Sequence, residues 1–284
     1  ESDGARIYDG EAKGLHTRVF LNKEGLPTYE AKELALAKMK EERLGSYDYS
    51  IISTSNEITE YFKVLLSAMG EIYPDLAVKT EHIGHGTVRL ASGKMSSRTG
   101  DVIPAVSFIN EVAEAALEKM TESSGLSDNE LAQDIAISAI KYATLRGNIL
   151  QNSVFDKEKA LSFEGDSGPY LQYTYARIQS VLEKAVAAGV FPKTELPPPT
   201  AYAVEKLLAQ FPQVIATALA ERAPHKITTY LTELAGEFNS FYAQEKIADP
   251  SDEYAPYKAA VAQAVAITLK NGLWTLGIKA PERM

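Results

Sequence analysis

The stretch EHIGHGTVRLASGKMSSRTGDVI, residues 81–103, joins a strand-like run to a loop of distinctive composition. The run GTVRLA (86–91) has the β-rich character of a short strand. The loop after it combines glycines and serines with two cations, Lys94 and Arg98. Glycines allow close backbone approach, and cations and hydroxyls such as that of Ser96 bind phosphate oxygens. The stretch therefore indicates either a loop that closes over a polyphosphate at a strand end or a solvated surface loop.

The chain before this loop alternates strand and helix signals. Thr28 stands at the expected N-cap of the first helix. This order predicts an open α/β sheet, whose ligands bind beyond the carboxyl ends of its strands. The expected strands are 16–22, 49–54 and 86–91, and the expected helices between them are 28–43 and 56–72.

Beyond residue 105 the strand signals nearly vanish and helical patterns take over. Prolines and glycines mark the boundaries, with LPPPT (196–200) between two helices and Pro212 at an expected first helical turn. The fold class is therefore α/β followed by an all-α helical bundle. The expected helices are 105–121, 127–148, 169–188, 200–210, 212–222, 225–247 and 253–275.

Composition limits the classes of function. The 284 residues carry a formal charge of −9, which argues against binding nucleic acid by bulk electrostatics. The acidic excess lies in the first 164 residues, so a local RNA-binding surface in the nearly neutral remainder is still possible. With no cysteine, a disulfide framework and a thiolate zinc site are excluded, and a cytoplasmic enzyme is the default expectation. No apolar run approaches the length of a membrane span, so we expect no membrane contact.

Two strings in the opening stretch match signatures of class I aminoacyl-tRNA synthetases. Lys94-Met95-Ser96-Ser97 is similar to the KMSKS signature, although Ser97 replaces the second lysine and Arg98 follows it. The resemblance implies that Lys94, Ser96 and Arg98 stabilise the pyrophosphate that leaves as an adenylate forms, and that Met95 and Ser97 also contact ATP.

His82-Ile83-Gly84-His85 spells the HIGH signature of the same family, but its context differs. In the family, that motif precedes a helix, whereas here a strand-like run follows it. We interpret the match as coincidental. His82 and His85 still lead toward the loop, and His82 is expected to border the ATP site.

Four stretches in family order resemble the C-terminal half of arginyl-tRNA synthetases. That resemblance implies an arginine–tRNA ligase using ATP with Mg²⁺, L-arginine and tRNA(Arg), acting as a monomer and binding no resident metal. It divides the chain into the second part of the catalytic domain (1–105), a helical connector (106–164) and an anticodon-binding domain (165–284). The missing Met and a hairpin-like start suggest a fragment that lacks the family's HIGH half. The stretches are GLHTRVFLNKEGLPTYEAKELAL (14–36), GKMSSRTGDVI (93–103), FEGDSGPYLQYTYARIQSVL (163–182) and LGIKAPERM (276–284).

Recognition of arginine needs carboxylates that match a guanidinium, with something for the alkyl stem. Tyr29 and Glu33, at i and i+4, share one face of a helix near a strand end. The family has a tyrosine and an aspartate there, so Glu33 is one methylene longer, and the resemblance places Glu57 where the family has a glutamine. The resemblance therefore implies that these three residues bind arginine. The alternative is that Tyr29 packs and both acids are solvated helix charges.

Aromatic residues gather beside one arginine in GPYLQYTYARI. Tyr173 and Arg177 share a helix face, and unstacked RNA bases are held by such groups. The resemblance implies that they bind the anticodon together with Tyr242 and Met284. The alternative is that the tyrosines of this segment pack the bundle.

Two other functions fit the same residues. One is a non-catalytic tRNA-binding module made from the same parts. The other is an unrelated α/β nucleotidyltransferase with a helical tail, which would have no affinity for tRNA.

Overall fold

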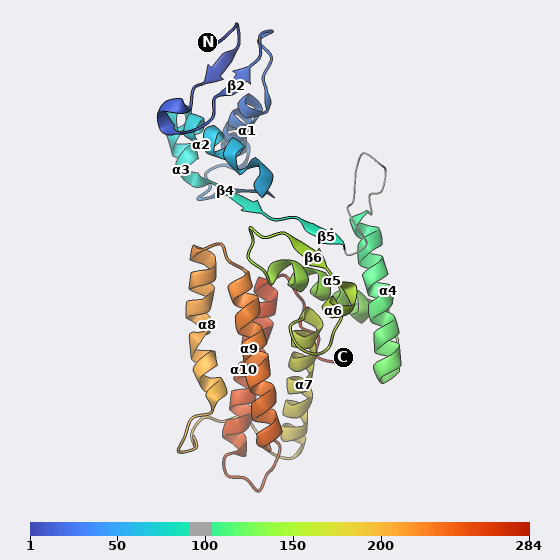
Figure 1. Ribbon diagram of the computed structural model, residues 1–284. Coiled ribbons are helices and arrows are strands. Elements are labelled where there is room, and N and C mark those ends of the chain that lie inside the picture. Colours follow the sequence, from blue (N-terminus) through green and yellow to red (C-terminus); the bar gives the residue numbers. More distant parts are fainter. Residues whose placement is uncertain (91–103) are drawn as a thin grey trace. The chain divides into compact units, whose positions relative to one another are not determined.

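The computed structural model describes residues 1–90 and 104–284, and the chain forms two compact units (Figure 1). The first, here called the α/β unit, comprises Glu1–Thr87 and Leu150–Asn152. The second, the helical unit, comprises Val88–Ile149 and Ser153–Met284. Lys94, Met95, Ser96, Ser97 and Arg98, which are expected to contact ATP, lie outside the described residues.

The α/β unit contains a parallel β-α-β arrangement, which confirms the α/β prediction for this part. Strand β3 (Ser50–Ser55) pairs in parallel with β4 (Thr80–His85), and their last residues, Ser55 and His85, are partners. Helix α2 (Thr59–Ile72) lies between them in sequence and is preceded by a 3₁₀ turn, Asn56–Ile58. A short helix, α3 (Pro74–Lys79), leads into β4.

A separate antiparallel hairpin precedes this arrangement. Strand β1 (Arg6–Tyr8) pairs with β2 (Arg18–Leu21), a 3₁₀ turn at Glu11–Lys13 lies between them, and helix α1 (Tyr29–Leu44) follows. Thr28 is at the N-cap, as predicted, although its side chain makes no capping hydrogen bond. Its hydroxyl instead donates to the carbonyls of Val19 (2.7 Å) and Phe20 (3.1 Å), which ties the helix start to β2.

The expected third strand needs a correction. A strand does form inside 86–91, as β5 (Val88–Leu90), but it pairs with β6 (Ser153–Phe155) in the helical unit. The partner of β3 is β4, which contains the HIGH string and which the sequence interpretation did not assign as a strand. The reason is that TEHIGH alternates poorly in hydrophobicity, so only its pairing reveals it as a strand.

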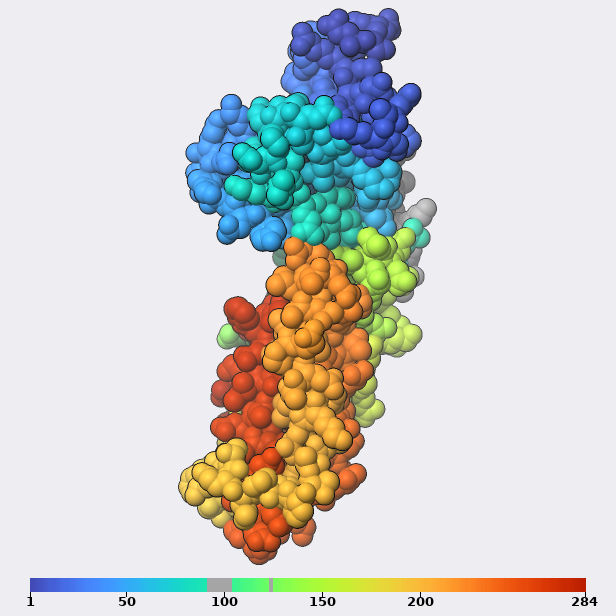
Figure 2. Space-filling model, turned by 90° about the vertical axis from the view of Figure 1, so that its left-hand side faces the viewer, coloured from blue at the N-terminus to red at the C-terminus, as the bar shows by residue number. Residues whose placement is uncertain are grey.

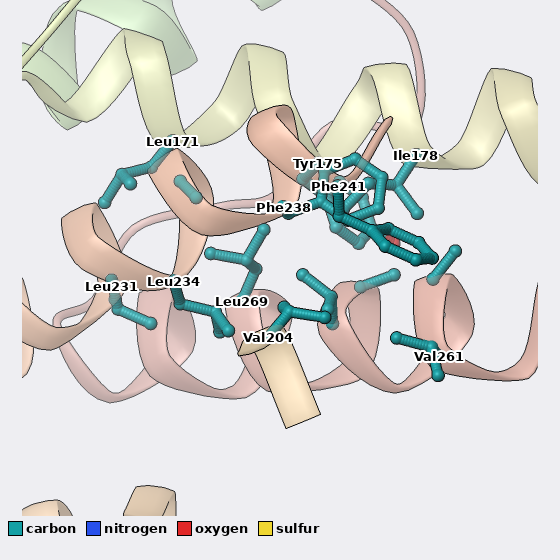
Figure 3. Packing of buried hydrophobic residues seen from close by; sticks show 14 of the residues in the cluster. Leu171, Tyr175, Ile178, Val204, Leu231, Leu234, Phe238, Phe241, Val261 and Leu269 are labelled. Atoms are coloured by element: carbon teal, nitrogen blue, oxygen red, sulfur yellow. The ribbon is translucent and has the colours of Figure 1, made fainter. Parts of the chain in front are cut away.

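The helical unit buries the larger core. Figure 3 shows Leu171, Phe238 and Leu269 from three different helices meeting in it. The helices are α4 (Ala105–Ser124), α5 (Asn129–Leu145), α6 (Lys157–Ala160), α7 (Gly168–Ala187), α8 (Ala203–Ala220), α9 (His225–Gln244) and α10 (Ala255–Thr275). Gly272 on α10 leaves room for Leu231 of α9 to pack against the helix backbone, since a Cβ at Gly272 would lie 2.5 Å from Leu231 Cδ2.

Two of the expected helices are in fact one. Residues 200–210 and 212–222 were expected as separate helices, but α8 runs continuously through Pro212. A proline removes one backbone hydrogen bond and crowds the preceding turn, which is tolerable where the backbone is open to water. Figure 2 shows α8 at the surface of the bundle, and Leu219 on it is 66% exposed. Packing of its buried face, which includes Val204 and Ala218, therefore outweighs the proline signal.

A nearly buried lysine connects α9 to α10. Lys258 Nζ lies 2.6 Å from Asp252 Oδ2 and 2.5 Å from Glu245 Oε2, and only 6% of the residue is exposed. The hydrogen bond from Lys258 is the main cause that holds the pKa of Asp252 below its ordinary value of 3.8, and burial opposes it. Two carboxylates thus balance one cation at the end of the bundle.

We expect acid to weaken this connection. Because the native pKa of Asp252 is lowered, its stabilising contribution is complete above pH 3.8 and is lost as the pH falls through the lower native value. Asp252→Asn should therefore flatten the acid side of the curve of unfolding free energy against pH, measured by urea unfolding. Glu195→Gln, in the exposed segment before α8, is the control and should leave the slope unchanged. An unchanged acid slope in Asp252→Asn would contradict the role of this ion pair.

Candidate functional site

Helix α7 holds the aromatic and arginine pair in direct contact. The guanidinium carbon of Arg177 lies 4.8 Å from the centre of the Tyr173 ring, and Nη1 donates to Asn239 Oδ1 at 2.8 Å. Asn239, on α9, in turn donates from Nδ2 to the hydroxyl of Tyr170 at 3.0 Å. The arginine is therefore held in place from two helices while Tyr173 remains 38% exposed.

This pair borders a cavity of about 410 Å³ in the helical unit. The C-terminus returns to α7 (Figure 1), and Met284 forms part of the cavity wall. Apolar side chains form most of the remaining wall, whereas Glu164 and Arg177 offer an acceptor and a donor of hydrogen bonds. A flat ring could stack inside on aromatic and guanidinium planes and hydrogen-bond at its edge. The lining residues are Met120, Leu131, Ile135, Phe163, Glu164, Tyr173, Arg177 and Met284.

The fourth residue expected at this site lies elsewhere. Tyr242, on α9, is 39% exposed and stacks on Phe238, with ring centres 6.2 Å apart and planes 10° apart. It borders a second cavity, of about 480 Å³, together with Lys184 and Lys246. Tyr173, Arg177 and Met284 thus meet in one cavity, and Tyr242 faces another.

The residues expected to bind arginine lie in the α/β unit. Tyr29 is 78% exposed at the start of α1, and its ring partner is Lys32, whose Nζ lies 5.5 Å from the ring centre. Glu33 is half-buried, and Glu57 is exposed in the 3₁₀ turn directly after β3. Glu57 therefore follows the carboxyl end of a parallel strand, where α/β proteins bind ligands. Among the described residues, no hydrogen bond or ring contact joins these three to one another.

A neighbouring cluster was not anticipated from the sequence. Glu30 is 8% exposed and lies 3.8 Å from Arg18, whose guanidinium carbon is 5.7 Å from the centre of the Tyr61 ring. The Tyr61 hydroxyl is buried and has no hydrogen-bond partner among the described residues. Burial, followed by the charges of Glu30 and Glu33, raises the pKa of Tyr61 to about 12. Glu33 thus acts on this cluster electrostatically.

His82 is packed into the α/β unit by its ring. It stacks on Phe62, with ring centres 4.0 Å apart, and its Nε2 lies 2.8 Å from Thr54 Oγ1. Burial lowers its pKa, so the neutral imidazole is favoured. The string HIGH lies within β4 and is followed by β5, which confirms that no helix follows it directly. Contact of His82 with ATP stays a prediction.

Comparison with known proteins identifies the chain's relatives. Residues 1–157 match the family described as tRNA synthetases class I (R), catalytic domain. The chain belongs to the arginyl-tRNA synthetase family. Residues 171–284 match a second description, the DALR anticodon binding domain, which agrees with the helical fold of this part.

Curated relatives match along the whole chain. An arginine–tRNA ligase of Flavobacterium psychrophilum is 31% identical over 100% of this chain and 48% of its own length. One of Lactobacillus acidophilus is 32% identical over 100% of this chain and 51% of its own. The chain therefore spans about half the length of the curated relatives it matches.

Solved structures agree with this result. The chain is similar to Thermus thermophilus arginyl-tRNA synthetase, with a TM-score of 0.78 and 27% identity over 100% of this chain and 55% of that one. Arginyl-tRNA synthetase from Plasmodium falciparum gives a TM-score of 0.79 at 19% identity, covering 100% of this chain and 49% of that one, and so shares the fold.

Several residues at the candidate site were not anticipated from the sequence. Phe163 and Glu164 line the cavity, and Asn239 positions Arg177. Phe163 and Glu164 stand in the quoted stretch 163–182, so proximity in sequence could have indicated them. Asn239 gave no such signal, because its role depends on the packing of α9 against α7.

Two further observations concern membrane spans and metal binding. None of the described helices is long and apolar enough to cross a membrane. Within residues 1–90 and 104–284, no group of three or more His, Asp or Glu side chains is arranged to hold a metal ion.

Proposed function

We propose that this chain forms the part of an arginine–tRNA ligase that holds the KMSK-like loop and the anticodon-binding domain. The whole enzyme would join ATP, as its Mg²⁺ complex, to L-arginine, release pyrophosphate, and transfer the arginyl group to tRNA(Arg). The proposed parts are 1–105 for the catalytic portion, 106–164 for the connector and 165–284 for the anticodon-binding domain. We further propose a cytoplasmic monomer.

The observation that carries this proposal is the meeting of Tyr173, Arg177 and Met284 in one cavity. The cavity combines an exposed aromatic face, a fixed guanidinium and an acceptor, Glu164, which together suit one unstacked RNA base. Tyr242 and Lys184 border the neighbouring cavity and could contact the next part of the loop. The proposed arginine site consists of Tyr29, Glu33 and Glu57, whose carboxylates would pair with the guanidinium of the substrate.

Binding of tRNA(Arg) tests the proposal directly. The chain should bind tRNA(Arg) more tightly than a tRNA with an unrelated anticodon, and both affinities should fall as salt rises. Filter binding at several salt concentrations measures both. Equal affinity for the two tRNAs would refute anticodon recognition, and no affinity for either would refute tRNA binding by this part of the enzyme.

The catalytic part of the proposal rests on Lys94. In the full-length enzyme, Lys94→Ala should slow arginine-dependent ATP–pyrophosphate exchange by about tenfold, because one charge-assisted contact to the leaving pyrophosphate is lost. Affinity for tRNA(Arg) should stay unchanged, which is the internal control. An unchanged exchange rate would remove the assigned role, and absence of exchange in the unaltered enzyme would favour a non-catalytic tRNA-binding module.

A further inference from the structure

The segment after α10, residues 277–284, is here called the C-terminal tail. Its direction is set at the helix end, where Gly277 has φ +69°. The backbone N–H of Gly277 donates to Trp274 O at 2.9 Å, and that of Ile278 donates to Leu273 O at 2.8 Å. These two bonds form a Schellman motif, in which a left-handed glycine ends the helix and turns the chain. The tail therefore leaves α10 in a defined direction.

Side chains from α5 and α7 then hold the tail. Lys141 Nζ, on α5, donates to the carbonyl of Gly277. Gln172 Nε2, on α7, donates to the carbonyl of Lys279 at 2.8 Å. Lys279 Nζ lies 2.9 Å from Asp134 Oδ1 on α5. These three contacts attach the tail at Gly277 and at Lys279, before it reaches Met284.

Gln172 is the buried member of this set. Its side chain is fully buried, and Oε1 has no hydrogen-bond partner among the described residues. Over residues 1–90 and 104–284, the bond to Lys279 O is the one hydrogen bond of its side chain. A buried amide that loses its partner is destabilised, so Gln172 favours the attached tail over a released one.

The position of Gln172 on α7 connects the tail to the cavity. It directly precedes Tyr173 in sequence, but its side chain points into the bundle, whereas Tyr173 is partly exposed at the cavity. One turn of α7 thus supplies both a cavity wall and the attachment of the tail that carries Met284. Met284 also packs against the core cluster of α4 and α5, which includes Ile135.

We propose that Gln172 is a positioning residue, which attaches the C-terminal tail so that Met284 closes the cavity beside Tyr173 and Arg177. The role in RNA binding rests on the function proposed above for this cavity. The attachment itself can be measured without RNA, so the two proposals can fail separately.

Gln172→Met tests the attachment because methionine has a similar length and volume and cannot donate the hydrogen bond. The chain contains no cysteine, so Met284→Cys introduces a single thiol at the cavity. Its labelling rate by a thiol reagent reports how often the tail opens. Adding Gln172→Met should raise that rate about fivefold, the change in population that one net hydrogen bond produces.

Binding supplies the second readout. Gln172→Met alone should weaken binding of tRNA(Arg) about fivefold, again the loss of one net hydrogen bond, and leave binding of an unrelated tRNA unchanged. Gln213→Met, the same replacement on the exposed side of α8, is the matched control and should alter neither measurement. Should Gln172→Met fail to fold, Lys141→Met, at an exposed position, removes the side-chain hydrogen bond to the carbonyl of Gly277 and should also speed labelling.

Each outcome bears on one proposal. Unchanged labelling in both variants would overturn the attachment. Faster labelling with unchanged affinity for tRNA(Arg) would overturn the link between tail position and the cavity. If the unaltered chain does not prefer tRNA(Arg), the proposed function fails, whereas the labelling rates still decide whether Gln172 holds the tail.

Discussion

Gly168→Ala is expected to lower the free energy of unfolding of the helical unit by about 3 kcal/mol, the upper part of the usual range for overpacking a core. Gly168 opens α7 where that helix meets Ser138 of α5. A Cβ at Gly168 would lie 2.4 Å from Ser138 Oγ and 2.5 Å from Ser138 O. The serine side chain could rotate away, but the backbone carbonyl cannot, so the two helices must separate.

Gly236→Ala provides the matched control for this prediction. Gly236 is inside α9, and nothing lies within 4 Å of a Cβ built there. Alanine is the better helix former by about 1 kcal/mol, so this variant should be more stable than the unaltered chain. Urea unfolding followed by circular dichroism compares the two. Equal stability of Gly168→Ala and the unaltered chain would show that the α5–α7 contact adapts without cost.

Arg177→Met is expected to weaken binding of tRNA(Arg) about 30-fold, the combined effect of losing a charge-assisted hydrogen bond and a stacking surface. Arg177 is held by Asn239 and lies over the ring of Tyr173, so its guanidinium is already oriented toward the cavity. Little conformational entropy is then lost on binding, which makes the contact strong.

Two further variants separate recognition from charge. Arg177→Lys keeps the charge but loses the planar donor group, so it should recover only a small part of the affinity. Lys270→Met removes one positive charge from an exposed position on α10 and should have little effect. Filter binding against tRNA(Arg) and an unrelated tRNA measures the affinities of Arg177→Met, Arg177→Lys and Lys270→Met. If Lys270→Met weakened binding as much as Arg177→Met, general electrostatics would explain the result and the cavity would have no specific role.

Local patterns predicted most elements of the fold. The helical repeats located α4, α5, α7, α9 and α10, because a stripe of apolar residues at helical spacing needs no knowledge of its partner. Prediction failed at Pro212 and at Thr80–His85 for one common reason. In both places a weak or opposing local preference is overruled by contacts with residues distant in the chain.

The candidate site could be predicted only in part. Tyr173 and Arg177 were placed on one helix face, and their contact follows from a spacing of four residues. The same spacing of Tyr29 and Glu33 predicted a shared face, but the structure pairs Tyr29 with Lys32 and places the charge of Glu33 near Tyr61. Spacing along a helix defines which side chains can meet, and the surrounding elements determine which of them do.

The sequence by itself determined the α/β and helical parts, the likeness to arginyl-tRNA synthetases and the residue types of the sites. It also determined that HIGH leads into a strand, since the residues that follow do not form a helix. Only the tertiary structure decided that β4 pairs with β3 and that Met284 lies beside Tyr173 and Arg177. Tyr242 likewise faces a different cavity. The physical reason is that local preferences act over a few residues, whereas these contacts depend on how surfaces far apart in the chain pack against one another.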